Sequence, residues 1–409
     1  MKVAYYSPLP PERSGIADYS ALLLPALRRR FEVEVARRRR PALRKSDVAL
    51  YHVGNNPQAH GWIVDALRRR PGVVVLHDLV LHHLVAGLTL ARGNAAGYIA
   101  AMERDGGAEA RRLAEDVAAG RARGPWETGP ERYPLAGEIL EHATGLIVHS
   151  RYTEQGARAE GYAGRIWRIP LAAGPVPDVD AAPVDGSPLI GSFGHVNPAK
   201  RIPQLLRAFA RLRERRPEAK LVLAGEVAPG FELERRVDEL GLADAVVSEG
   251  YVDDRRLWSL MAACDVIVSL RAPTMGETSA AALQALALGK PLVVSDLGWF
   301  AELPDGVARH VPVGGPELDV LADALEELAG DERLRRSMGD AAVEYVRAEH
   351  DLERVAEQYL AALEWALGGE PVADAVLAEI AQAAAEVEIG ADSPELVAIA
   401  RELRESDLV

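Results

Sequence analysis

The chain has 409 residues, enough for about two domains, and 48% of them are hydrophobic, as in an ordinary globular protein. No apolar run approaches the roughly 18 residues of a membrane span, and a predicted strand begins at the N-terminus, so we expect a cytoplasmic protein without a signal peptide. A net charge of −14 argues against nucleic-acid binding, and the single Cys264 excludes an internal disulfide framework.

Charge is divided unevenly along the chain. Residues 1–170 carry 25 Lys and Arg against 18 Asp and Glu, whereas the remainder carries 22 against 43. Solvated helix and strand faces explain the basic clusters at 28–30, 37–40 and 68–70 most simply. The basic half could instead attract an anionic acceptor, or hold the protein at the inner face of a membrane as a peripheral protein.

The first half alternates short, β-branched apolar runs with helical stretches. That alternation predicts a parallel sheet covered on both faces by helices. A polar, helical insert from about Gly93 to Glu141 interrupts it. The apolar runs are KVAYYSP, FEVEVA, DVALYHVG, VVVLHD and GLIVHS.

A Pro-, Asp- and Gly-rich linker leads to a second half with the same alternation, in LIGSFG, KLVLAGE, AVVSEGYV, CDVIVSL, PLVVSD and ARHVPV. The predicted class is α/β, with two doubly wound, Rossmann-like domains that face each other across a ligand-binding cleft. The segment after Gly369 is predicted to be a helical tail, which could mediate self-association into a homo-oligomer or simply end the protein. The predicted boundaries are 1–172 for the first domain, 173–188 for the linker, 189–348 for the second domain, 349–368 for a helix that packs back on the first domain, and 369–409 for the helical tail.

The stretch RAPTMGETSAAALQALALGKPLVVSD carries the strongest functional signal. It predicts a strand end, a glycine turn, an Ala-rich helix and a second strand, with Glu277, Thr278 and Ser279 at the helix start. Free N–H groups and the positive end of the helix dipole would bind a diphosphate there. A carboxylate at this corner, Glu277, fits a ligand that also carries hydroxyl groups, as a nucleotide sugar does. An ordinary strand–helix–strand unit with a capping Glu is the alternative.

Two first-half motifs follow strands at positions that would face the cleft. Ser14 and Gly15 open a helix, where a glycine lets the backbone approach a substrate closely, although a simple turn explains it as well. His77 and Asp78 end the run VVVLHD. His77 could donate to a sugar hydroxyl or polarise the reacting centre, with Asp78 orienting it, or it could be a structural histidine.

In the second half, GSFGHVNPAKRIPQLLRAF predicts a strand end at Gly194 and a helix beginning near Pro198. Lys200 would fall in the first helical turn, where the helix dipole favours acids, so a cation there implies a nearby anion. A surface lysine is the alternative. Tyr251 and Val252 follow another strand, at a place where a nucleotide base could lie against the backbone.

Together these residues resemble glycosyltransferase family 4, which has the GT-B fold. The resemblance covers about residues 1–368 and is carried by SGIADYS, GHVNPAKR, LVLAGE, GYVDD and GETSAAALQALALGKPLVVSD. It implies metal-independent transfer of a sugar from a nucleoside diphosphate donor, a UDP- or GDP-sugar, with retention at the anomeric carbon and no cofactor. The acceptor would be a glycan or lipid-linked hydroxyl in polysaccharide biosynthesis, bound by the first domain, with the nucleotide sugar on the second.

The resemblance also implies individual roles on the donor. Lys200 would neutralise the leaving diphosphate, and the N–H groups of Thr278 and Ser279 would hold it. Glu277 would bind donor-sugar hydroxyls, and His77 would lie beside the sugar.

On the acceptor side, Gly15 would pass close to both substrates, flanked by Ser14 and Asp78. His82 and His83 are adjacent histidines, a pairing that could suggest a metal site. No HExxH motif or matching carboxylate pattern accompanies them, so no metal site is expected.

The sequence departs from the family at three positions. The family usually has Arg where His195 stands and Glu where Gln284 stands, and Glu277 takes the first glutamate's role only with a one-residue shift. A nucleotide-sugar epimerase of the same fold is one alternative, although it needs acid–base carboxylates that the first half offers sparsely. A catalytically weakened partner subunit that binds nucleotide sugar is the other.

Overall fold

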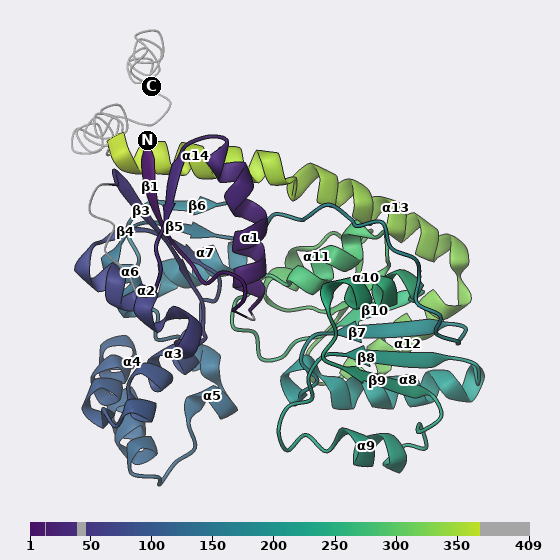
Figure 1. The fold of residues 1–409 in the computed structure, drawn as a ribbon. Helices are drawn as coiled ribbons and strands as arrows, with labels where there is room; N and C mark the ends of the chain where they lie inside the picture. The colour runs from purple at the N-terminus through teal and green to yellow at the C-terminus, as the bar shows by residue number, and fades with distance from the viewer. Residues whose placement is uncertain (13, 39–45, 369–409) are drawn as a thin grey trace, which may run out of the picture.

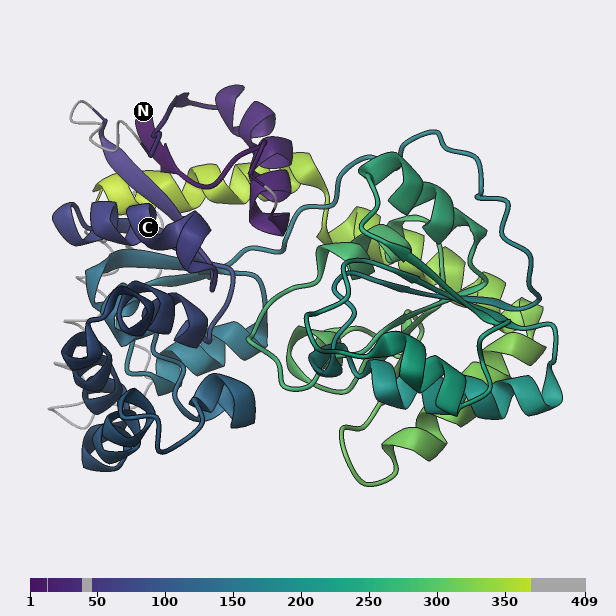
Figure 2. The same cartoon turned by 60° about the horizontal axis from the view of Figure 1, so that its bottom comes forward.

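The computed structural model describes residues 1–12, 14–38 and 46–368. It contains two α/β domains, each built on a six-stranded parallel sheet with helices on both faces (Figures 1 and 2). The two doubly wound domains expected from the sequence are therefore present, and the tail predicted over 369–409 lies outside the described residues.

The first sheet has the strand order β2-β1-β3-β4-β5-β6, and all neighbouring strands are parallel. The central β3 and β4 are buried throughout, as expected for strands covered on both faces. Its strands are β1 (Lys2–Tyr6), β2 (Glu32–Val35), β3 (Val48–Val53), β4 (Gly72–Leu76), β5 (Ala143–Val148) and β6 (Ile166–Arg168), and its helices are α1 (Gly15–Arg28), α2 (Pro57–Arg69), α3 (His82–Leu88) and α7 (Arg151–Ala159).

The predicted insert between β4 and β5 is helical and has a small apolar core of its own, which includes Tyr98 and Met102. In Figure 1 it lies below the first sheet, at the lower left of the view. Its elements are η1 (Leu90–Arg92), α4 (Ala95–Ala118), α5 (Pro125–Thr128), η2 (Pro130–Arg132) and α6 (Gly137–His142).

The second sheet has the order β12-β11-β10-β7-β8-β9, again all parallel. Its strands are β7 (Leu189–Phe193), β8 (Lys220–Ala224), β9 (Val246–Gly250), β10 (Val266–Ser269), β11 (Leu292–Ser295) and β12 (Ala308–Val311). The helical elements are η3 (Pro198–Lys200), α8 (Ile202–Arg215), α9 (Leu233–Glu239), α10 (Asp254–Ala263), α11 (Ala280–Ala287), η4 (Gly298–Glu302), α12 (Glu317–Gly330) and α13 (Glu332–Glu349).

The winding of each sheet changes direction once, between β1 and β3 in the first domain and between β7 and β10 in the second. In open parallel sheets, ligands bind at the carboxyl ends of the strands next to such a switch point. The loops that leave these four strands therefore form the expected site in each domain.

The last described helix, α14 (Leu352–Gly368), crosses from the second domain and packs on α1 of the first (Figure 1). Tyr359 is fully buried, with its hydroxyl 3.3 Å from that of Tyr19. Arg30 also pairs with Glu353 at 2.9 Å. The chain thus passes between the domains twice, through the extended linker and between α13 and α14.

Gly225 allows a close crossing at the carboxyl edge of the second sheet. Its φ is +150°, and a Cβ there would lie 2.1 Å from the carbonyl oxygen of Gly194. Gly230 also has a positive φ, +78°, but has open space around it. We expect Gly230→Ala to lower the free energy of unfolding by about 1 kcal/mol through backbone strain, and Gly225→Ala by roughly 2 kcal/mol more because the methyl group cannot be accommodated. Urea unfolding followed by circular dichroism tests this, and equal losses in the two variants would contradict it.

Candidate functional site

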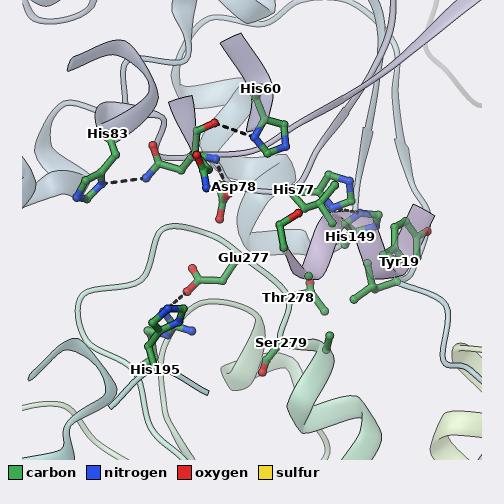
Figure 3. A pocket seen from close by; sticks show the side chains of 18 of the residues that line it. Tyr19, His60, His77, Asp78, His83, His149, His195, Glu277, Thr278 and Ser279 are labelled. Atoms are coloured by element: carbon green, nitrogen blue, oxygen red, sulfur yellow. Dashed lines mark hydrogen bonds and ion pairs between the residues drawn. The ribbon is translucent and has the colours of Figure 1, made fainter. Parts of the chain in front are cut away.

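A pocket of about 750 Å³ lies between the two domains at both switch points. Its walls come from the loops after β1, β3, β4 and β5 on one side and after β7 and β10 on the other (Figure 3). It is lined by Ser14, Gly15, Ile16, Tyr19, Asn55, Asn56, Pro57, Gln58, His60, His77, Asp78, His83, His149, Leu171, His195, Arg271, Glu277, Thr278, Ser279 and Ala280.

On the first-domain wall, hydrogen bonds to the backbone fix two loops. The Ser14 hydroxyl accepts from the amide of Ala17 and caps α1, so that Gly15 begins that helix at the pocket. Asn56 caps α2 in the same way. A Cβ on Gly15 would meet nothing within 4 Å, so this glycine leaves room for a ligand beside it.

Three buried histidines form a hydrogen-bonded chain across the ends of β3, β4 and β5. His149 Nδ1 lies 2.8 Å from the carbonyl oxygen of Ile169, His149 Nε2 lies 3.3 Å from His77 Nδ1, and His77 Nε2 lies 2.9 Å from His52 Nδ1. Burial, together with the neighbouring histidines, holds the pKa of His52 and His77 well below the usual range, and burial lowers the pKa of His149 to about 4. All three rings are therefore neutral at pH 7.

The end of this chain fixes its tautomers. A carbonyl oxygen only accepts, so His149 must carry its proton on Nδ1 and accept through Nε2. His77 then donates through Nδ1 and accepts from His52. Both ring nitrogens of His77 are thus engaged, and in this arrangement neither is free for the sugar hydroxyl that the sequence suggested.

The expected orientation of His77 by Asp78 is wrong, because Asp78 faces a different loop. Its Oδ2 accepts from the backbone amide of Asn55 at 2.8 Å. Burial, and then the charge of Glu277 across the cleft, raises the pKa of Asp78 to about 7. The pocket therefore holds a carboxyl group that keeps its proton to a higher pH than an exposed aspartate does.

On the second-domain wall, Glu277 is held by its own loop. Its Oε1 lies 2.8 Å from an Arg271 nitrogen, and its Oε2 accepts from the amide of Met275 at 2.7 Å and the hydroxyl of Thr274 at 3.2 Å. The carboxylate is thereby fixed at the cleft with lone pairs left for further donors.

The helix that follows, α11, begins at the pocket as predicted. Ser279 is its N-cap, and its hydroxyl accepts from the amide of Ala282. The amides of the first helical residues have no partner within a helix, so these donors and the positive end of the helix dipole point toward the pocket. Beside them, the Thr278 hydroxyl is buried without a hydrogen-bond partner. This corner is suited to bind an anion.

Lys200 does not line the pocket, and the helix expected around it begins later. Pro198–Lys200 form a single 3-10 turn, Arg201 adopts φ +55°, and α8 starts at Ile202. Lys200 is nearly completely buried and donates to the carbonyl of Phe193 at 3.1 Å. Burial, and then the charge of Arg271, lowers the pKa of Lys200 to about 7.

Arg201 and Arg271 could each supply the positive charge that the family's arginine provides at the position of His195, but they differ in how free they are to contact a ligand. Arg201 is paired with Glu317, a glutamate that is 4% exposed. Arg271 lines the pocket, and its Nε is buried without a partner although the guanidinium also pairs with Glu277. Among the described residues that line the pocket, Arg271 is therefore the one lysine or arginine.

The pocket brings eight of the predicted residues together, and four lie elsewhere. Gln284 lines a neighbouring cavity of about 410 Å³, which shares Gly15, Tyr19, Leu171 and Ala280 with the pocket. Tyr251 is 64% exposed, and Val252 packs against the core. Lys200 is the fourth predicted residue that does not line the pocket. The eight that do are Ser14, Gly15, His77, Asp78, His195, Glu277, Thr278 and Ser279.

Several residues of the first-domain wall had no predicted role. Asn55, Gln58 and His149 line the pocket, and His52 completes the histidine chain behind it. For His52 and His149 the available sequence signal was their position at strand ends in DVALYHVG and GLIVHS, and Asn55 directly follows the first of these runs. Within the described residues there is no group of three or more His, Cys, Asp or Glu that could bind a metal ion, and no helix with the length and apolar character needed to cross a bilayer.

Residues 179–345 match the family of glycosyl transferases group 1. The matched residues run from within the linker to within α13 of the second domain. The match and the fold confirm the resemblance to GT-B enzymes of this type over the region that carries the Glu277 loop.

Curated relatives match the chain over part of their length. An MMP alpha-(1->4)-mannosyltransferase of Mycolicibacterium hassiacum is 33% identical over 146 residues, 35% of this chain and 34% of the relative. A D-inositol 3-phosphate glycosyltransferase of Nocardia farcinica is 30% identical over 195 residues, 45% of this chain and 42% of the relative. A lipopolysaccharide core biosynthesis mannosyltransferase, LpcC, of Rhizobium leguminosarum is 30% identical over 183 residues, 44% and 51% of the two chains. The chain thus spans about a third to a half of these relatives.

Solved structures show that the likeness in fold extends over both domains. Anabaena Alr3699/HepE in complex with UDP and glucose superposes with a TM-score of 0.60 at 18% identity, covering 89% of this chain and 99% of that one. Sucrose-phosphate synthase from Thermosynechococcus elongatus gives 0.61 at 19% identity, covering 88% and 97%. At these identities the comparison establishes the two-domain GT-B fold.

The raised pKa of Asp78 predicts a pH-dependent effect on stability. Because its folded pKa of about 7 lies above that of the unfolded chain, the folded state binds the proton more tightly. Stability from this group is complete below the pKa of the unfolded chain and is lost as the pH rises through the folded pKa of about 7. We expect Asp78→Asn, which cannot ionise, to raise the melting temperature at pH 8 more than at pH 5. Calorimetric unfolding at both values tests this, and a gain that is the same at both would contradict it.

Proposed function

We propose that the protein is a retaining glycosyltransferase of the hexosyltransferase type, which moves a sugar from a nucleoside diphosphate sugar to an acceptor hydroxyl. The observation that carries this proposal is the inter-domain pocket, in which the N-terminus of α11, Arg271 and a fixed Glu277 converge. The group 1 match of the second domain and the sugar transferases among its relatives support it. A UDP- or GDP-sugar fits, without a metal or cofactor.

The donor diphosphate would lie at the start of α11. The N–H groups of Thr278 and Ser279 would bind it together with Arg271, and the buried Lys200 would add charge from behind. Glu277 would accept from hydroxyls of the donor sugar. The nucleoside would extend into the neighbouring cavity, where Gln284 can hydrogen-bond ribose hydroxyls.

The reaction breaks the bond between the sugar's anomeric carbon and the diphosphate oxygen and forms a bond from the same carbon to the acceptor oxygen. Negative charge develops on the leaving diphosphate, where the α11 amides and cations can stabilise it. In a front-face transfer, the proton of the acceptor hydroxyl passes to the departing phosphate oxygen. The neutral His77 chain would form the wall beside the sugar rather than exchange a proton with it.

The acceptor would enter along the first-domain wall, past Ser14, Gly15, Gln58 and Asp78. A glycan or lipid-linked hydroxyl fits this polar surface. The lipopolysaccharide core mannosyltransferase among the relatives supports an acceptor of polysaccharide biosynthesis. Membrane contact through the basic half stays a prediction, and flotation with anionic liposomes at physiological salt tests it.

Substitution of two donor-site residues tests the proposal. We expect Lys200→Ala and Glu277→Ala each to lower sugar transfer by roughly 100-fold or more, because both act where charge or hydroxyls of the donor are bound. Lys290→Ala is the matched control: that ammonium is also partly buried and donates to a backbone carbonyl, of Ala262, outside the pocket. Transfer is measured with UDP- and GDP-sugars against a panel of glycan acceptors after calorimetry has identified the nucleotide bound. Near-normal transfer by either site variant would overturn the assignment.

The pKa of Lys200 gives a second test. At pH 8 a lysine with a pKa of about 7 is mostly neutral, and a bound diphosphate favours the charged form. We expect the chosen nucleoside diphosphate to bind with uptake of up to about one proton at pH 8, and Lys200→Arg, which is always charged, to lose that uptake. Calorimetry in buffers of different ionisation enthalpy measures it. Equal uptake by both proteins would contradict the placement of Lys200.

A further inference from the structure

A carboxylate of the second domain completes the N-terminus of a first-domain helix. Glu302, the last residue of η4, accepts from the backbone amides of Arg151 and Tyr152, through Oε2 at 3.0 Å and Oε1 at 2.7 Å. These are the first two amides of α7. The third, that of Thr153, donates to the hydroxyl of Ser150, the N-cap residue. The helix cap is thus divided between the two domains.

The bond is charge-assisted and rigid on both sides. A carboxylate at the positive end of a helix dipole forms stronger hydrogen bonds than a neutral acceptor does. Glu302 is partly buried, and η4 is anchored by Trp299 and Phe300, which are 3% and 4% exposed. Its position is therefore set by the core of the second domain and not by a flexible loop.

Both sides of this contact adjoin the pocket. Ser150 directly follows the pocket residue His149 in sequence. From the same first turn of α7, Thr153 donates through Oγ1 to the carbonyl of Gly276 at 2.7 Å, and Gly276 directly precedes Glu277. The amide of Val80 donates to the carbonyl of Met275 at 2.9 Å.

The loop that carries Glu277 is thereby pressed against the first domain. A Cβ on Gly276, whose φ is +83°, would lie 2.7 Å from the Cβ of Leu79. The Glu277 loop and Glu302 therefore contact the first domain side by side, the loop at Leu79, Val80 and Thr153 and Glu302 at the first two amides of α7.

We propose that Glu302 is a positioning residue that closes the domains by capping α7, and so places Glu277 and the start of α11 opposite the acceptor wall. The inference rests on the proposed function for its effect on turnover. Glu302 does not line the pocket, so its contribution to transfer passes through the geometry of the two domains. A group that merely stabilised the fold would change the melting temperature without separating donor binding from transfer.

The experiment compares Glu302→Ala and Glu302→Gln in the full chain. Asp331→Ala is the matched control, because Asp331 caps α13 by accepting from Leu334 within the second domain. Three quantities are measured for each protein: the affinity for UDP and GDP by calorimetry, the rate of sugar transfer, and the radius of gyration by small-angle X-ray scattering with and without nucleotide.

We expect Glu302→Ala to lower the transfer rate by about tenfold or more and to enlarge the radius of gyration, because closure loses two charge-assisted bonds. Nucleotide affinity should stay within about threefold, since the nucleotide lies on the second domain. Glu302→Gln, which keeps one accepting oxygen, should recover part of the rate, and Asp331→Ala should change stability alone.

The proposal would be overturned if Glu302→Ala had the wild-type transfer rate and radius of gyration. It would also be overturned if Asp331→Ala lowered the transfer rate as much as Glu302→Ala does. If the wild-type chain bound no nucleotide and transferred no sugar, the proposed function would fail instead. The scattering comparison would still decide whether Glu302 holds the domains together.

Discussion

Strand direction is the constraint on which the site depends. Because every strand in both sheets is parallel, all carboxyl ends in a domain lie on one edge, and the loops at the two switch points are the ones that meet across the cleft. Two such carboxyl edges, facing each other across the domains, are enough to form the pocket. Ser14, Asn55, His195 and Arg271 then come together although they lie as much as 257 positions apart, between Ser14 and Arg271.

Removal of water sets the charge of this pocket as much as its residue types do. Burial keeps the His52–His77–His149 chain neutral and moves Asp78 and Lys200 from opposite directions toward the same pKa, about 7. A polar wall of neutral rings therefore faces a wall with an anion-binding helix start. That contrast fits a substrate with a charged leaving group and an uncharged sugar.

Local sequence patterns predicted the fold and the second-domain wall of the pocket, whereas they did not predict contacts between residues on different strands or domains. The strand runs and the Ala-rich helix after Ser279 are encoded within a few residues, and they appear where expected. The start of α8 was missed because Arg201 adopts a left-handed conformation, which a non-glycine residue rarely signals. The histidine chain depends on the register of β3, β4 and β5, and the Glu302 cap on the docking of two domains. Neither the strand register nor the docking of the domains can be predicted from local patterns in a single sequence.

The return of α14 to the first domain has a consequence for synthesis on the ribosome. The face of α1 that holds Tyr19 is covered by Tyr359, which is added some 340 residues later. The first domain is thus translated early yet completes its own core late, after the second domain has emerged. Until then, an apolar face of α1 stays exposed during translation, and a chain that ends before α14 would leave it exposed for good.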